Sequence, residues 1–518
     1  MATQANLLVT ALVVSVLLFW RIPRKRYPPG PRRYPILGNL FDIPKTHAYK
    51  KFAQYSKDLD SDIIYLDAAG TPFIILNSLE ASVELLDKRS IRYSSRTHTT
   101  MGHDLVGCQR LFVMLPYNDE WRESKRVMVK HLSAPDQTPI VSRIRDFVRK
   151  SLLPNFLTSP EDFLVHIKNG VGGSIISLAY GLPIRRVADP WVALADEGMQ
   201  CVTAAIVPGK YAVDALPFLK YLPEWFPGAG FQKEARESRE VLRRFFRNPF
   251  EATKKGMADG SVQPSFLSQS LEDASETDDK EYREKLLENV GGMFTAGGTD
   301  SSVTAVKTLV AVLLLYPEVQ MKAQAEIDTV IGSSRLPDFD DKPNLPYINA
   351  VVKEVLRWQP PIPGGFPHMS TEDDTYKGYF IPKGSIVMGN TWAIMHDEKT
   401  FPDPSRFDPE RFLTPLGQLR QDKNIPDPEI VATFGFGRRI CPGMNVGLTG
   451  FWLAAVSIIS CFNVSPQLNE SGEPDVPKIE YLGKELIHPE PFKCRIKPRS
   501  KQATSLIQSE YDETSEYV

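Results

Sequence analysis

The chain has 518 residues, of which 42% are hydrophobic and 24% are charged, a composition typical of a globular protein with a large core. The formal net charge of −2 argues against nucleic acid as a partner, and the only basic cluster is a short one near the N-terminus. The five cysteines are widely spread and include no Cys-x-x-Cys pair, which favours a reducing compartment over a disulfide framework or a zinc site.

The N-terminal segment is apolar and is followed by basic residues. Residues 1–20 carry no charged side chain, and twenty helical residues span about 30 Å, the hydrocarbon thickness of a bilayer. Arg21, Arg24, Lys25 and Arg26 follow directly, whereas a secretory signal peptide carries its positive charge before the apolar run. We predict that residues 1–26 form an uncleaved membrane anchor whose C-terminal side is cytosolic. A helix lying in the membrane interface is the alternative.

The next patterned segments are a hairpin and a helix. Residues 62–76 contain two β-rich runs around a glycine turn, which predicts a hairpin. Downstream, a helix bearing Trp121, Lys125 and Arg126 is expected to begin at Asn118 and Asp119. Trp121 and Lys125 are four positions apart, so an indole N–H and an ammonium share one helical face.

Two segments further along read as irregular. Residues 208–231 contain several prolines and aromatic residues, and the prolines interrupt the segment too often for a core helix. Aromatic side chains of this kind suit a membrane interface. Residues 254–285 are polar and acidic, and we predict that they form a surface loop.

A long apolar pattern predicts one helix over residues 286–316, with two adjacent glycines, Gly297 and Gly298, at its centre. Each glycine costs a helix roughly 1 kcal/mol relative to alanine, so a close approach or a local distortion is expected there. Thr299, Asp300 and Ser301 follow and supply one carboxyl and two hydroxyl groups. The alternative is a glycine-kinked core helix that faces a cavity.

Two more helices are predicted at residues 317–332 and 346–358. In the second, Glu354 and Arg357 are three positions apart and can pair, although this spacing alone is common among surface ion pairs. Arg411 lies further downstream in the run Phe-Asp-Pro-Glu-Arg-Phe.

One cysteine stands in the loop Phe-Gly-Phe-Gly-Arg-Arg-Ile-Cys-Pro-Gly at residues 434–443. Its glycines at 435 and 437 permit positive φ and close approach of the backbone to a flat ligand. Pro442 suits the first position of the helix predicted near residues 448–462, so Cys441 is expected at a helix N-terminus, where a thiolate is stabilised. A thiolate, a tight turn and Arg439, placed to meet a carboxylate, together describe a haem pocket with a cysteine ligand.

This loop matches the haem-binding signature Phe-Gly-x-Gly-x-Arg-x-Cys-x-Gly of the cytochrome P-450 monooxygenases at every fixed position, and the chain resembles that family over most of its length. The resemblance implies a mainly α fold with small β-sheets (α+β) and one catalytic domain over residues 27–498. Residues 1–26 would be its anchor. Residues 499–518 have little apolar content, and we predict a disordered polar tail.

The resemblance also implies roles for individual residues. Cys441 would ligate haem b, with Phe434, Arg439 and Gly443 around it. The propionates would be met by Trp121, by His368 and by Lys125 or Arg126, because the family usually has arginine where this chain has Lys125. Glu354, Arg357 and Arg411 would form a buried triad behind the haem.

On the predicted glycine-kinked helix, Asp300 and Ser301 fit the acid and alcohol positions of the family's oxygen-binding groove. Ser301 stands where threonine is usual and lacks the methyl group that fixes the rotamer. A shifted register is the alternative, with Asp300 at the alcohol position or Thr299 as the working hydroxyl.

The implied activity is insertion of one oxygen atom from O2 into a small apolar substrate. The sequence has no nicotinamide or flavin motif, so electrons from NADPH are expected through a separate NADPH–cytochrome P-450 reductase that docks near Arg438. Residues 208–231 would roof the substrate pocket and touch the membrane. The implied location is the endoplasmic reticulum membrane, with the catalytic domain facing the cytosol.

Several short segments most resemble fungal secondary-metabolism members of the family, among them Tyr-Leu-Pro-Glu-Trp-Phe-Pro-Gly at residues 221–228. They imply a terpenoid substrate, with a polyketide or an indole-type compound as alternatives. Two other classes of function stay open from the sequence. One is a redox-neutral haem-thiolate isomerase or dehydratase, and the other is a non-catalytic haem-binding membrane protein.

Overall fold

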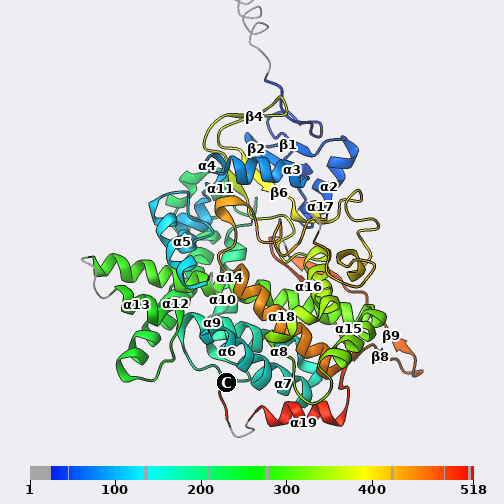
Figure 1. Ribbon diagram of the computed structural model, residues 1–518. Coiled ribbons are helices and arrows are strands. Elements are labelled where there is room, and N and C mark those ends of the chain that lie inside the picture. The colour runs from blue at the N-terminus through cyan, green and yellow to red at the C-terminus, as the bar shows by residue number, and fades with distance from the viewer. Residues whose placement is uncertain are drawn as a thin grey trace, which may run out of the picture.

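The computed structural model describes residues 25–44, 46–132, 138–207, 209–274, 279–421, 425–483, 485–511 and 515–518. The predicted anchor lies outside the described residues apart from Lys25 and Arg26. Helices form most of the molecule, and the main sheet gathers at one end of it, at the top of Figure 1. This is the mainly helical architecture with small sheets that the sequence predicts.

The main sheet has four strands in the order β1-β2-β6-β3. β1 (Ile63–Ala68) and β2 (Thr71–Leu76) form the predicted antiparallel hairpin, and β2 pairs in parallel with β6 (Ile386–Gly389), which pairs with β3 (His368–Met369). The remaining strands form two-stranded pairs, namely β4 (Asp374–Tyr376) with β5 (Tyr379–Ile381), β7 (Phe462–Ser465) with β12 (Arg495–Pro498), β8 (Gln467–Leu468) with β9 (Pro474–Asp475), and β10 (Tyr481–Gly483) with β11 (Ile487–Pro489).

The longest helix, α14 (Lys280–Leu315), runs through the centre of the molecule beside α18 (Met444–Cys461) (Figure 1). Both helices are apolar around most of their circumference because neighbours cover them on several sides. The other long helices are α2 (Ala48–Asp58), α5 (Asp119–Leu132), α6 (Thr138–Phe147), α9 (Gly173–Tyr180), α10 (Pro190–Ala205), α12 (Gly230–Asp259), α13 (Phe266–Ala274), α15 (Pro317–Val330), α16 (Pro346–Trp358) and α19 (Lys501–Ser509).

Within the described residues, α14 and α18 are also the two helices that are long and apolar enough to cross a membrane. Their most apolar windows are 67% and 61% buried inside the molecule, respectively. This burial identifies them as core helices, since a membrane-spanning helix would present its apolar surface to lipid.

Two predictions about polar segments were wrong. Residues 254–285, expected to be a surface loop, continue α12 to Asp259, then form α13 and the start of α14. The expected disordered tail contains α19, whose Ile507 is fully buried and whose first turn is capped by the Ser500 hydroxyl. The polar composition of both segments did not reveal these helices. A helix cap and a few apolar side chains are enough to stabilise a helix when the side chains can pack against the core.

The chain end is also ordered against the body. Residue Tyr517 forms an antiparallel bridge with Arg185, and the Val518 amide donates to the Ile184 carbonyl at 3.0 Å. These contacts lie on the connection between α9 and α10, so the last residues stabilise the entry into α10.

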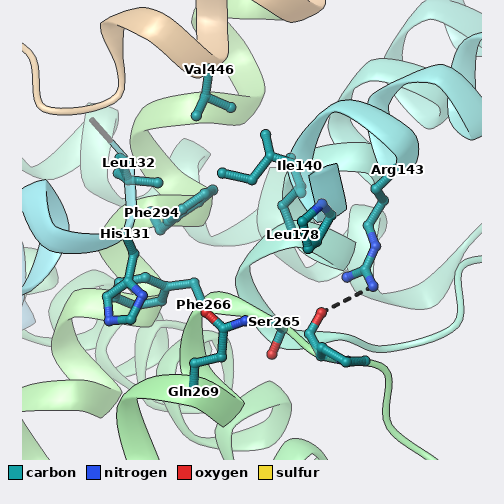
Figure 2. Close-up of a pocket in the computed structure, with 12 residues that line it drawn as sticks. His131, Leu132, Ile140, Arg143, Leu178, Ser265, Phe266, Gln269, Phe294 and Val446 are labelled. Carbon is teal, nitrogen blue, oxygen red and sulfur yellow. Dashed lines mark hydrogen bonds between the residues drawn. The ribbon is translucent and has the colours of Figure 1, made fainter. Parts of the chain in front are cut away.

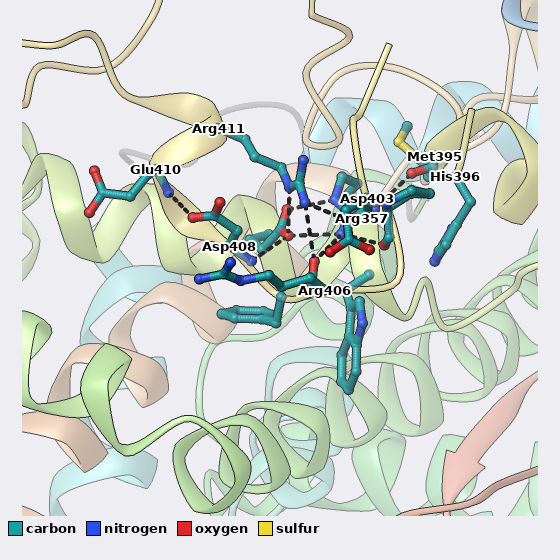
Figure 3. A network of polar contacts seen from close by, with 12 residues as sticks. Arg357, Met395, His396, Asp403, Arg406, Asp408, Glu410 and Arg411 are labelled. Atoms are coloured by element: carbon teal, nitrogen blue, oxygen red, sulfur yellow. Dashed lines mark hydrogen bonds and ion pairs between the residues drawn. The ribbon is translucent and has the colours of Figure 1, made fainter. Parts of the chain in front are cut away.

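A buried ion network joins α16 to the segment around Arg411 (Figure 3). Arg357 donates to both carboxylate oxygens of Glu354, at 2.6 and 2.8 Å, and both side chains are fully buried. The Arg411 guanidinium lies 3.4 Å from the same carboxylate, and the Asp408 amide donates to it at 2.8 Å. The predicted triad is therefore confirmed, and backbone carbonyls accept further hydrogen bonds from the Arg357 and Arg411 guanidinium groups.

Replacing Glu354 with alanine is expected to destabilise the protein by about 3–5 kcal/mol, because two buried guanidinium groups lose their acid. Glu240→Ala is a matched control, since Glu240 and Arg243 have the same spacing and bidentate geometry on the exposed surface of α12. Thermal unfolding and the yield of soluble protein measure the difference. Equal losses in the two variants would contradict the importance of burial for this network.

Candidate active site

The loop around Cys441 is built by two glycines with positive φ, as predicted. Gly435 has φ 82° and Gly437 has φ 51°. A Cβ on Gly437 would lie 2.6 Å from the Leu86 carbonyl oxygen, so this glycine lets the loop approach the π-helix η2 (Val83–Lys88). The Cys441 amide donates to the Phe434 carbonyl at 2.8 Å, which closes the turn.

Cys441 precedes α18 by three residues, because Gly443 occupies the N-cap position and the helix begins at Met444. The sequence predicted Pro442 as the first helical residue, and this prediction was wrong, because the helix begins two residues later. Burial raises the pKa of the Cys441 thiol, while the Gly443 amide and Lys125 act in the opposite direction. Cys441 is nevertheless accessible from outside the protein, so a ligand can reach this residue.

α5 supplies an indole and an ammonium beside this loop. Asn118 caps the helix by accepting a hydrogen bond from the Trp121 amide. Trp121 is buried, and its Nε1 has no hydrogen-bond partner among the described residues. Lys125 donates to the Arg438 carbonyl, whereas Arg126 on the same helix is exposed. The geometry thus favours Lys125 over Arg126 as the cation near the loop.

Two buried guanidinium groups and one imidazole form a cluster, which Arg439 connects to Trp121. Arg439 stacks 4.6 Å from the Trp121 ring and donates to the carbonyls of Ser94 and Leu115. Arg96 donates to the carbonyls of Val113 and Pro367, at 3.0 and 2.6 Å. Burial lowers the pKa of both arginines, and neither forms an ion pair within the described residues. Arg96 was not predicted, because nothing in its local sequence marks it.

His368 belongs to the same cluster. Its Nδ1 contacts the Tyr93 carbonyl at 2.7 Å, so this nitrogen carries a proton and donates it. Burial and then the Arg96 charge lower the pKa of His368 well below its usual value, which leaves Nε2 as an acceptor. A carboxylate bound nearby would raise this pKa and turn Nε2 into a donor.

Comparison with known proteins shows which family these site residues belong to. Residues 28–494 match the cytochrome P450 family. The chain belongs to the cytochrome P450 family. It is 40% identical over 97% of its length to cytochrome P450 monooxygenase 98 of Postia placenta, of which the match covers 97%.

Two further relatives cover almost the whole of this cytochrome P450. Cytochrome P450 monooxygenase ple1 of Rhodocybe pseudopiperita is 37% identical over 98% of this chain and 97% of its own length. Tryptamine 4-monooxygenase of Psilocybe cyanescens is 36% identical over 96% of this chain and 98% of its own. The protein is thus a fungal-type haem monooxygenase, an oxidoreductase that uses haem with a cysteine thiolate ligand and electrons from a redox partner.

The residues around Cys441 fit a haem. Haem carries two propionates, and the cluster offers two guanidinium groups without an acid in the described residues. The unpartnered Trp121 indole N–H supplies a further donor. Buried charges are stable only when they are paired, so these groups call for a dianionic ligand.

The glycine-centred helix presents Ser301 and Thr299 on different faces. The Ser301 hydroxyl donates to the Gly297 carbonyl at 2.9 Å and is partly exposed, as is Gly297 itself. The Thr299 hydroxyl is buried and donates to the Thr295 carbonyl at 2.8 Å. The Thr299 methyl group packs against η7 (Lys168–Gly172), where a Cβ on Gly172 would meet it at 2.9 Å. Ser301 is therefore the hydroxyl on the open face of α14.

Asp300 lies in a mixed-charge environment. Burial and then the Asp196 charge raise the pKa of Asp300, while Lys168 and Lys307 oppose this rise. Lys168 and Asp196 form an ion pair at 2.6 Å, and both are about one-third exposed. A carboxyl group whose pKa is raised, close to groups that reach solvent, is suited to take up and release a proton.

A separate small cavity lies between α5, α6, α13, α14 and α18 (Figure 2). His131, Arg143 and Phe294 are among its lining residues, and Arg143 donates to the Pro264 carbonyl. The centre of a water-sized sphere can occupy about 30 Å³ in this cavity, so the cavity has room for a water molecule but not for an organic substrate. It contains none of the predicted site residues.

Arg96→Gln is expected to weaken haem retention while leaving the haem-free protein as stable or more stable, because it removes a buried charge that only haem neutralises. A charge-assisted hydrogen bond corresponds to about a tenfold to hundredfold faster haem loss. Transfer of haem to apomyoglobin measures the loss rate. Arg126→Gln, on the exposed face of α5, is the control, and equal haem-loss rates in both variants would contradict the assignment of Arg96.

Proposed function

We propose that this protein holds haem b on Cys441 and oxygenates a small apolar compound in fungal secondary metabolism. The observation that carries this proposal is the pocket of uncompensated positive charge beside Cys441. A closed apolar fold would exclude such charges unless a dianionic group were to bind there.

Each residue of the pocket has its own role in this proposal. Cys441 donates a soft anionic sulfur to the iron, and the turn from Phe434 to Gly443 holds that sulfur in place. Arg96, Arg439, His368 and the Trp121 indole hold the propionates, and Lys125 adds positive charge close to the loop. The haem, when bound, supplies the redox chemistry of oxygen activation.

Proton delivery is assigned to Asp300 and Ser301. Oxygen activation consumes protons, and the Ser301 hydroxyl on the open face of α14 can pass one from its Oγ to the haem side. Asp300, which directly precedes Ser301, takes protons from the side of Lys168 and Asp196. Thr299 is the weaker candidate, because its hydroxyl is buried against Thr295.

NADPH–cytochrome P-450 reductase is the proposed electron donor. Arg438 and Arg122 lie near Tyr117 on the Cys441 side, where acidic groups of a partner could meet them. Rate dependence on ionic strength is the measurement that decides whether charge guides this docking.

A terpenoid is the proposed substrate class, and an indole-type or polyketide compound is the alternative. The relative named tryptamine 4-monooxygenase supports the indole alternative, since its printed substrate contains an indole ring. Co-expression with a reductase and separate feeding of terpenoid, polyketide and indole precursors distinguishes the three classes by the mass of the products.

We also propose attachment to the endoplasmic reticulum membrane through residues 1–26, with residues 208–231 as a second contact. The described part of this second segment exposes large aromatic side chains, Tyr221 by 79% and Trp225 by 81%. Such side chains are typical of membrane interfaces. Fractionation of chains with and without residues 1–26 decides the matter, since partial retention of the shortened chain on membranes is the outcome that the second contact requires.

Cys441→Ser should abolish the red-shifted Soret band of the reduced, carbon-monoxide-treated protein, because a hydroxyl does not replace a thiolate. Product formation should fall to background. Cys494→Ser, at a buried cysteine with no assigned ligand role, should keep the band. A red-shifted band in Cys441→Ser would exclude Cys441 as the ligand.

Ser301→Ala should lower the ratio of product to NADPH consumed, by about tenfold or more, because proton delivery loses its hydroxyl on the open face. Ser301→Thr should keep or raise this ratio, since the β-branched side chain restricts χ1. Thr299→Ala is the control for the alternative hydroxyl. A normal ratio in Ser301→Ala together with a low ratio in Thr299→Ala would transfer the role to Thr299.

A further inference from the structure

One short stretch of backbone, residues 93–96, runs along the cluster of positive charge that is assigned to the haem propionates. The Tyr93 carbonyl accepts a hydrogen bond from His368 Nδ1 at 2.7 Å. The Ser94 carbonyl accepts one from Arg439 Nε, also at 2.7 Å. Two consecutive carbonyls therefore orient two side chains of the cluster, although these side chains come from distant parts of the sequence.

The other half of the stretch is bound to the same region. The Ser95 carbonyl accepts a hydrogen bond from the Met369 amide at 2.9 Å, which fixes the stretch beside β3. Arg96 supplies a buried guanidinium group of its own and donates to the Pro367 carbonyl at 2.6 Å. Residues 93–96 thus hold one imidazole and two guanidinium groups, and a displacement of this stretch would move all three.

An acid from outside the cluster holds the start of this stretch. Asp374, the first residue of β4, accepts a hydrogen bond from the Tyr93 hydroxyl at 2.9 Å. Arg89 donates to both of its carboxylate oxygens at 3.2 Å, and Arg92 donates to one of them at 3.0 Å. These donors lie on the short helix α4 (Ser90–Tyr93) or directly before it, so one carboxylate binds both ends of α4.

The Asp374 carboxylate is shielded from water and keeps its charge. Its side chain is 7% exposed, and Tyr93 is fully buried. Burial raises the pKa of Asp374, but hydrogen bonds from the Thr375 amide, Tyr93 and Arg89 outweigh burial, so the pKa is lowered. Shielded hydrogen bonds to a charged acceptor are stronger than exposed ion pairs, so Asp374 is a firm anchor for the residues that follow α4.

We propose that Asp374 is a positioning residue for the haem: through Tyr93 it fixes residues 93–96, and so orients the three groups that these residues hold toward the propionates. The proposal rests on the propionate assignment made under Proposed function. The hydrogen-bond partners of Asp374 in the described part of the chain lie beside α4 or in β4, so its effect on the haem passes through the backbone.

The reduction potential of the haem reports this positioning. Cationic groups close to the propionates offset their negative charge, which otherwise favours the ferric state of the iron. A looser stretch 93–96 would therefore lower the reduction potential and speed the loss of haem. It would also move the propionate bending band of the resonance Raman spectrum to lower frequency, because the propionates would lose hydrogen bonds.

The first test is Tyr93→Phe in the full-length holoenzyme, because this change removes the hydroxyl that joins Asp374 to the stretch and leaves every charge in place. The reduction potential should fall, and the propionate band should move to lower frequency. Transfer of haem to apomyoglobin should be about three- to tenfold faster, since a hydrogen bond to a charged group is lost.

Asp374→Asn separates positioning from simple electrostatics. Removal of a negative charge alone would raise the reduction potential, since it favours the ferrous state. We expect a lower potential and faster haem loss instead, because residues 93–96 lose their anchor. The double variant Tyr93→Phe with Asp374→Asn should lose haem no faster than Asp374→Asn alone.

Glu372→Gln is the matched control. Glu372 lies two residues before Asp374 and pairs with the same Arg92, but its side chain is 56% exposed. The variant removes the same charge from the same part of the surface without removing the partner of the Tyr93 hydroxyl. Its haem-loss rate and propionate band should equal those of the parent protein, and its reduction potential should be equal or slightly higher.

A parent-like potential and haem-loss rate in Tyr93→Phe would overturn the positioning role, and this variant decides the matter if Asp374→Asn yields no folded protein. A rise in potential in Asp374→Asn as large as that in Glu372→Gln would also overturn it. A parent protein that retains no haem would instead overturn the haem site on which the proposal rests. The two failures are therefore distinguishable.

Discussion

Arg96 and Arg439 are buried close to each other without an acid in the described residues, and the centre of the protein is arranged around this excess of positive charge. Among the described residues, backbone carbonyls accept the hydrogen bonds of their N–H groups. Such an arrangement is costly for the empty fold, because carbonyl dipoles offset only part of the desolvation of two charges. A dianionic cofactor would neutralise it, so cofactor binding and folding stability are linked in this protein.

The buried charges around Glu354 differ from this cluster, because they neutralise one another. Glu354 has two guanidinium partners and a backbone amide, so the charges of the network at α16 are paired without any ligand. This pairing holds the network in place, since Glu354 or Arg357 would lose several hydrogen bonds at once by moving. The protein thus has one paired ion network that supports the fold and one cluster of positive charge that needs an anionic ligand.

Other ion pairs of the protein are closer to solvent. Asp104 with Lys220 and Lys168 with Asp196 are each about one-third exposed, and each pair connects two different elements. Their partial exposure keeps their energies small, so these contacts break more readily than the buried network at Glu354. The contrast between the buried network and these partly exposed pairs separates firmly held contacts from contacts that break readily.

The sequence by itself determined much of this protein. The hairpin at residues 63–76, the helix at residues 346–358 and the positive φ of Gly435 and Gly437 all follow from local rules, because turn chemistry and periodicity act over a few residues. The sequence of the loop around Cys441 also indicated the family. These features need no knowledge of what lies on the other side of the core.

Tertiary structure alone decided the remaining points. Arg96 became part of the pocket only because the chain returns there from 270 residues away, at Phe366. Ser301, rather than Thr299, lies on the open face of α14 because η7 covers the other face. The tail residues 501–509 are helical because a docking surface exists for Ile507. In each case the deciding partner is distant in sequence, and burial against that partner outweighs the local preference of the chain.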